Sequence, residues 1–235
     1  MARVTYSSEP RHYLPVLLRA AALAILLGVP LPAAAVTIDF DDLAAMVNSP
    51  GDAVPMANRL STELLASVGV AFTSVADFVA VVVHAPDLTT SMPNVIGGVN
   101  SAGGLSYGSP VFISFFDPAD PTAKAVTDFV SIRGDRVPVA DASATMEAFD
   151  ANGGLLGFVT APDSEVGLTL SLSIPGIHMV RLTQDSASTL YDGTIGFDDL
   201  TFNPVQAIPE PPRLALVLTG LTSLGLGGRR RAARG

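Results

Sequence analysis

Short segments in which apolar residues recur at every second position are the feature that most constrains this chain. Residues 168–173 read Leu-Thr-Leu-Ser-Leu-Ser, so an extended backbone places the leucines on one side and the hydroxyl residues on the other. A period of two with one polar side is typical of an antiparallel sheet that exposes one face. Gly, Pro, Asp, Asn and Ser separate ten apolar segments that suit strands: 36–40, 70–72, 78–84, 111–116, 125–132, 144–149, 155–160, 168–173, 177–183 and 195–202.

The connections between these segments also favour a β fold. Residues 150–154, Asp-Ala-Asn-Gly-Gly, predict a tight hairpin in which Asn152 and Gly153 take positive φ angles. Helix is expected only over residues 58–69, with Asn58 as the N-terminal cap and Gly69 as the stop. Residues 89–98 are expected to form a loop at the rim of a ligand site. We therefore predict an all-β chain, an antiparallel β-sandwich of the jelly-roll kind.

The first 35 residues have the layout of a secretory signal peptide rather than of a folded element. A basic stretch precedes an apolar segment at 20–29, and small residues follow, so we expect cleavage after Ala35. The alternative is an N-terminal membrane helix, but ten residues extend about 15 Å, half of a ~30 Å hydrocarbon core. The residues that carry this prediction are Arg3, Arg11, Arg19, Ala33 and Ala35.

The charge and the cysteine content limit the functions that are open to the body of the chain, residues 36–205. Residues 36–205 contain five basic and 20 acidic residues, a net charge of −15, so binding to nucleic acid is excluded on electrostatic grounds. The same charge attracts divalent cations or cationic partners. The chain has no cysteine, which leaves no disulfide scaffold, thiolate nucleophile or cysteine metal site. A body of this length buries enough surface to fold as one domain on its own core.

The tetrapeptide Phe-Asp-Asp-Leu occurs twice, at Phe40–Leu43 and at Phe197–Leu200. In each copy, the apolar residues before the aspartates and those after them would fall on opposite faces of a regular strand. This predicts a β-bulge or a strand end at the aspartates. If the first and last strands are neighbours, five carboxylates come close together, and hard oxygen ligands favour Ca²⁺. The alternative is a pair of strand ends with solvated aspartates. The residues concerned are Asp39, Asp41, Asp42, Asp198 and Asp199.

Signals for catalysis are weak. Acidic residues at 39–42 and 163–167 would suit a secreted hydrolase only if two carboxyl groups lay about 5 to 9 Å apart across a cleft. His84 and His178 have no partner in a recognised catalytic motif, and we interpret both as structural. Aromatic platforms for sugars are few, since the domain has no Trp and only Tyr107 and Tyr191 as tyrosines. We expect a non-enzymatic protein.

The C-terminal 30 residues, 206–235, have three parts in order. Pro209, Glu210 and Pro211 precede an apolar, glycine-rich run at 214–228, which would reach about 22 Å as a helix, well short of a ~30 Å hydrocarbon core. A basic cluster follows and favours the cytoplasmic side of a membrane. We expect a short transmembrane helix, Leu214–Leu226, that is oriented by Arg229, Arg230, Arg231 and Arg234.

This tripartite tail resembles the PEP-CTERM sorting signal of Gram-negative bacteria that make extracellular polysaccharide. The resemblance implies recognition and processing by an exosortase, a multi-spanning membrane enzyme. The middle of the chain is similar to galactose-binding-type jelly rolls that often precede such tails, a group without shared catalytic residues. The segments that carry this second resemblance are LSTELLASVGVAF, SPVFISFFDP, AVTDFVSIRGD, MEAFDANGGLLG and DGTIGFDDLTF.

Together these features predict three parts: a helical signal peptide at 1–35, a β-sandwich domain at 36–205 and the sorting signal at 206–235. The expected protein is exported, anchored transiently in the inner membrane, and delivered to the cell surface or extracellular matrix. Its expected partners are signal peptidase and the secretion machinery, the exosortase, and extracellular polysaccharide. It requires no cofactor in this interpretation. The alternatives are a calcium-assisted carbohydrate-binding module and, third, a carboxylate-dependent hydrolase.

Overall fold

A computed structural model describes residues 34–47, 49–83, 93–134, 143–162, 167–185 and 195–208. The chain divides into two compact units, Met1–Ala34 and Ala35–Gly235, and every described helix and strand lies in the second. The expected signal peptide up to Ala33 and the expected tail from Pro209 onward lie outside the described residues. Among the described residues, no helix has the length and apolar character needed to cross a membrane.

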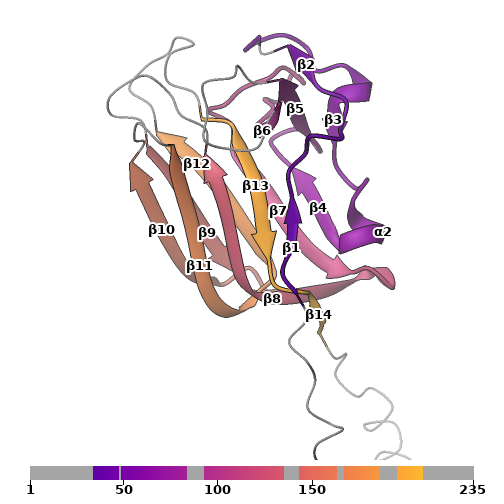
Figure 1. The fold of residues 1–235 in the computed structure, drawn as a ribbon, viewed down its shortest axis with the longest axis vertical. Coiled ribbons are helices and arrows are strands. Elements are labelled where there is room, and N and C mark those ends of the chain that lie inside the picture. Colours follow the sequence, from indigo (N-terminus) through magenta and orange to yellow (C-terminus); the bar gives the residue numbers. More distant parts are fainter. Residues whose placement is uncertain are drawn as a thin grey trace, which may run out of the picture. The chain divides into compact units, whose positions relative to one another are not determined.

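One layer of strands is built around β8 and β13 (Figure 1). The strand β8 pairs with β11 on one side and with β13 on the other, and β13 continues through β6 to β5. Two short strands, β2 and β3, pair with β5, and β1 pairs with β13. The bounds are β11 Leu168–Ile177, β8 Asp120–Gly134, β13 Phe197–Phe202, β6 Asn94–Gly97, β5 Val79–Val83, β2 Met46–Val47, β3 Arg59–Leu60 and β1 Val36–Ile38.

A second layer runs in the order β10, β9, β12, β7 and β4. The β7–β8 hairpin connects it to the first layer, and the short β14 pairs with β8. Within the described residues, the strand pairs are antiparallel except β2 with β5, which is parallel. The bounds are β10 Leu155–Pro162, β9 Ser143–Phe149, β12 Met179–Asp185, β7 Val111–Asp117, β4 Val70–Thr73 and β14 Gln206–Ala207.

The hydrophobic core lies where the two layers face one another. Along β9, buried and half-buried residues alternate at every position, which is the period-two pattern expected from the sequence. The Phe115 ring of β7 lies 5.2 Å from the Phe202 ring of β13, so the two layers meet through aromatic contacts. Full burial of a side chain of this size stabilises the fold by about 1.5–3 kcal/mol. The chain is therefore all-β and sandwich-like, as predicted.

Each of the ten predicted strand segments has a counterpart among the observed strands, whereas the predicted helix is mostly wrong. Residues Arg59–Leu60 form β3, and the helix α2 covers only Leu65–Val68. Its N-terminal cap is Leu64 rather than Asn58, because the preceding residues pair with β5. The predicted stop at Gly69 is confirmed, since this residue takes the left-handed conformation with φ 75°.

Two predicted connections are corrected in detail. The 150–154 hairpin joins β9 and β10, but only Gly153 of its central pair takes a positive φ, 84°. The turn is closed instead by Asp150, whose carbonyl oxygen accepts the Gly153 N–H at 3.0 Å. The expected ligand-rim loop at 89–98 is in part the strand β6, whose residues are all buried. Residues 84–92 lie outside the described part of the chain.

Candidate functional site

The structure brings the two Phe-Asp-Asp-Leu segments together. Strands β1 and β13 are neighbours, with Ile38 opposite Leu200, so the residues that follow Ile38 run beside those that precede Leu200. The predicted bulge is confirmed in β13, because its register with β8 shifts by one residue between Asp198 and Thr201. Asp199 sits inside this bulge and takes a left-handed φ of 49°.

The first copy forms a turn that Asn94 holds from the neighbouring strand β6. The Nδ2 group of this buried residue lies 3.0 Å from the Phe40 carbonyl oxygen, 3.2 Å from that of Asp41 and 2.9 Å from that of Leu43. The Asn94 backbone N–H in turn donates to Asp41 Oδ1 at 3.1 Å. One amide side chain thus lies within hydrogen-bonding distance of three carbonyl groups of a tight turn, and the Phe40 carbonyl oxygen also accepts the Leu43 N–H at 3.0 Å.

The second copy is organised by charge. Asp198 is completely buried, and its Oδ1 accepts the Asp199 N–H at 2.7 Å. Asp199 Oδ2 lies 3.4 Å from Arg133 Nη1, in an ion pair that is partly open to solvent. Arg133 and Gly134 are the last two residues of β8, and Gly134 pairs with Leu168 on one side and Phe197 on the other.

The predicted calcium ligands are Asp39, Asp41, Asp198 and Asp199. The ladder of β1 with β13 places these four residues at one end of the same strand pair, as predicted. Several of their carboxylate oxygens accept backbone N–H groups, including the N–H of Asp41 at Asp39 Oδ1, 3.4 Å away. Within the described ranges, no three His, Asp or Glu side chains are grouped so that they could hold a metal ion. Calcium binding stays a prediction.

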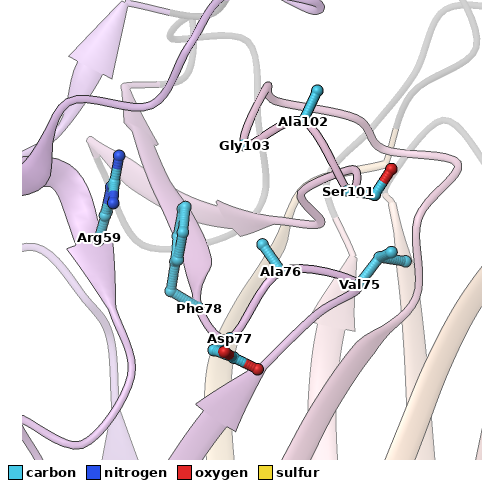
Figure 2. A pocket seen from close by; sticks show the side chains of 8 residues that line it. All are labelled: Arg59, Val75, Ala76, Asp77, Phe78, Ser101, Ala102 and Gly103. Atoms are coloured by element: carbon cyan, nitrogen blue, oxygen red, sulfur yellow. The ribbon is translucent and has the colours of Figure 1, made fainter.

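A pocket of about 630 Å³ opens beside β5 (Figure 2). It is a shallow depression that is largely open to solvent. Segments distant in the sequence form its wall, namely β3, the approach to β5, and the turn that follows β6 and Val99. The lining residues are Arg59, Val75, Ala76, Asp77, Phe78, Ser101, Ala102 and Gly103.

An arginine on an aromatic ring dominates one wall of this pocket. The Arg59 guanidinium carbon lies 4.3 Å from the centroid of the half-buried Phe78 ring, a cation–π contact. In Figure 2 the Phe78 ring stands between Arg59 and Ser101. Arg59 Nε and Nη2 both donate to the Val54 carbonyl oxygen at 3.0 Å, which fixes the guanidinium in place. The aromatic wall is therefore held rigidly from behind.

The opposite wall is a turn that is held by its own hydrogen bonds. Asn100 Oδ1 accepts the N–H groups of Ala102, at 2.9 Å, and Gly104, at 3.1 Å. The Asn100 carbonyl oxygen accepts the Gly103 N–H at 2.9 Å, and the Gly103 carbonyl oxygen accepts the Val54 N–H at 3.0 Å. Both walls are therefore hydrogen-bonded to the backbone of Val54, a buried residue that packs with Ala80 and Val82 of β5.

The sequence did not single out this pocket. Arg59 falls in the segment predicted to be helical, Phe78 is the first residue of the predicted strand 78–84, and Asp77 directly precedes that strand. The detectable signal was Phe78, an aromatic residue beside a carboxylate at a strand edge. Tyr107, which was considered as a sugar platform, is only 5% exposed and belongs to the core.

The remaining predicted site residues are distributed as follows. Ala35 is exposed and directly precedes β1, whereas Ala33 lies outside the described residues. The prediction that His178 is structural is confirmed, because it is buried with Nδ1 2.9 Å from the Ala125 carbonyl oxygen. Also outside the described residues are Tyr191, His84, residues 163–166, Pro209, Glu210, Pro211, Arg229, Arg230, Arg231 and Arg234.

Comparison with protein-family models finds no match to this chain, and comparison with curated proteins finds no significant similarity.

Proposed function

We propose that this chain is an exported, non-enzymatic protein of the cell surface or extracellular matrix. In this proposal the C-terminal segment acts as a PEP-CTERM signal, which an exosortase processes after transient anchoring in the inner membrane. The observation that carries the proposal is the order of the three tail parts: the triplet Pro209–Pro211, an apolar run too short for a comfortable anchor, and an arginine cluster. The body is a jelly roll of the galactose-binding type that serves as a structural or interaction component of the polysaccharide matrix.

The positions of the terminal strands support this proposal. Strand β1 begins at Val36, one residue after the expected cleavage site at Ala35. Strand β14 ends at Ala207, two residues before Pro209. Removal of residues 1–35 and 209–235 therefore leaves every described strand intact, whereas removal of the whole predicted tail, 206–235, would also remove β14 and its pairing with β8. The charge of −15 between residues 36 and 205 is consistent with a protein that works in water outside the cell.

The tail is tested by deleting residues 209–235 in a Gram-negative host that contains an exosortase. We expect the truncated protein to appear directly in the medium, whereas the intact chain passes through a membrane-bound stage and is shortened. Fractionation and the intact mass of the released protein measure both steps. A double substitution, Pro209→Ala with Pro211→Ala, should slow processing, while Pro204→Ala in the folded body should not. Unchanged localisation, size and release after the deletion would refute the proposal.

Carbohydrate binding is the second candidate, and the pocket beside β5 favours it. An aromatic ring, an arginine, a carboxylate and a hydroxyl group line one shallow opening. Calcium assistance is a separate part of this candidate, tested by adding Ca²⁺ or a chelator during polysaccharide binding. Loss of binding on chelation, and its loss in an Asp198→Asn variant, would support a calcium site at the paired Phe-Asp-Asp-Leu segments.

A further inference from the structure

We propose that the pocket formed by Arg59, Asp77, Phe78 and Ser101 binds a neutral pyranose unit of a polysaccharide. This inference rests on the proposed function, because an exported matrix protein meets polysaccharide, and it assigns that contact to one site. The argument depends on three properties of the pocket: an aromatic surface, a set of polar groups that lack protein partners, and a local charge of zero.

The aromatic surface is the Phe78 ring. Arg59 covers one face of the ring at 4.3 Å, and the ring also lines the pocket, on the side of Ser101 in Figure 2. The face of an aromatic ring carries partial negative charge and attracts the weakly positive C–H groups of an apolar surface. A pyranose ring presents such C–H groups on its flat side. Because Arg59 is already fixed by Val54, the platform needs little ordering when a ligand binds.

The polar groups around the ring suit sugar hydroxyls. Arg59 uses Nε and Nη2 within the protein, so the donors on Nη1 have no protein acceptor in the described chain. The exposed Asp77 carboxylate and Ser101 hydroxyl likewise have no protein hydrogen bond among the described residues. A hydroxyl group both donates and accepts, so sugar hydroxyls can donate to the Asp77 carboxylate and exchange hydrogen bonds with the Ser101 hydroxyl. Because Arg59 lies on the other face of the Phe78 ring, it can reach only a hydroxyl that extends past the edge of the ring.

Charge decides between a neutral and an acidic sugar. Within the pocket lining, the positive charge of Arg59 is balanced by the negative charge of Asp77. The surrounding body carries −15 between residues 36 and 205, and this field repels a polyanion such as a uronic acid polymer. The Nε and Nη2 donors of Arg59 already bind the Val54 carbonyl oxygen, and the guanidinium is stacked on Phe78. Arg59 is therefore poorly placed for bidentate pairing with a carboxylate. A neutral sugar therefore fits the charge of this pocket better than an acidic sugar does.

Affinity electrophoresis of the full-length protein tests this site, with polyoxyethylene detergent in the gel because sugar-based detergents would compete. Gels contain dextran or galactomannan as neutral probes, or polygalacturonate as the acidic probe. We expect at least one neutral polysaccharide to retard the protein. Phe78→Ala should weaken that binding about tenfold, which corresponds to about 1.4 kcal/mol. Asp77→Asn, at an exposed carboxylate, should weaken it by a similar factor without disturbing the fold.

Matched controls lie far from the pocket in the sequence. Phe158→Ala removes another exposed aromatic ring, from β10, and Asp128→Asn neutralises another exposed carboxylate, on β8; neither should change retardation. Thermal unfolding verifies that each variant is folded. The proposal is overturned if no neutral polysaccharide retards the protein, if polygalacturonate retards it more, or if both pocket variants bind like the wild type. Binding in vitro does not involve sorting, so failure here and failure of tail processing are separate results.

Discussion

The two Phe-Asp-Asp-Leu segments have the same four residues and different structures. In the first copy, Phe40 takes the left-handed conformation, φ 59°, and the segment leaves β1 as a turn closed by the Leu43 N–H on the Phe40 carbonyl. In the second copy, Asp199 is the left-handed residue, φ 49°, and the segment continues as the strand β13. The positive φ angle therefore falls on the first residue of the tetrapeptide in one copy and on the third residue in the other.

The difference follows from the neighbours of each segment. The second copy lies in β13, which is hydrogen-bonded to β8 on one side and to β1 and β6 on the other, so its backbone stays extended apart from the bulge. The first copy lies past the end of β1, where Asn94 supplies the hydrogen bonds of a turn. The second copy has an Asp at its left-handed position, a residue type that visits this region, whereas the first copy has the bulky Phe40 there, so its turn depends on the surrounding contacts. Long-range pairing selects between them.

The largest expected effect comes from removing the anchor of the first copy. Asn94→Ala removes the side-chain donor of the Asp41 and Leu43 carbonyl groups in a half-buried turn, and each unsatisfied buried group costs about 1–3 kcal/mol. We expect the free energy of unfolding to fall by about 3 kcal/mol in urea titrations. Asn203→Ala is the matched control, because its side chain bonds to Asp128 in an exposed setting. Equal losses in the two variants would show that Asn94 does not hold the turn.

The third position of the tetrapeptide separates the copies directly. Asp199→Val places a β-branched residue at φ 49° and removes the ion pair with Arg133, which should cost about 2 kcal/mol. Asp42→Val changes the equivalent residue of the first copy, which is exposed and does not take a positive φ, so a change within about 0.5 kcal/mol is expected. Thermal unfolding of both variants measures the difference. Similar losses would mean that the two backbones respond alike.

The smallest effect concerns an aspartate in a turn outside both copies. The N–H groups of Gly154 and Asn152 donate to the Asp150 carboxylate and hold its pKa below the usual 3.8. A pKa lowered by folding means that the carboxylate stabilises the native state above the unfolded-state pKa, and this contribution is lost as the pH falls through the folded-state pKa. Asp150→Asn should therefore flatten the decline of the urea midpoint between about pH 5 and pH 2. An identical acid decline in the wild type and the variant would contradict this assignment.

Much of the fold was predictable because it depends on local patterns. The alternation in residues 144–149 and the turn residues that follow them were enough to place β9, the hairpin and β10. The parity change in each Phe-Asp-Asp-Leu copy predicted an irregular strand before any pairing was known. The helix prediction for 58–69 failed because β3 pairs with β5, and this contact outweighs a weak helical propensity. Short strands such as β2 and β14 have two residues each and leave too little pattern to detect.

The sequence by itself determined the strand segments, the acidic body without cysteine, and the tripartite tail, because each depends on residue order or composition alone. Only the tertiary structure decided which aspartate enters the bulge, that Asn94 holds the first turn, and that Arg59, Phe78 and Ser101 border one pocket. Those features join residues that are tens to over a hundred positions apart in the chain. They arise when sheet pairing and core packing bring such residues together, and these long-range contacts have no signature in a short stretch of sequence.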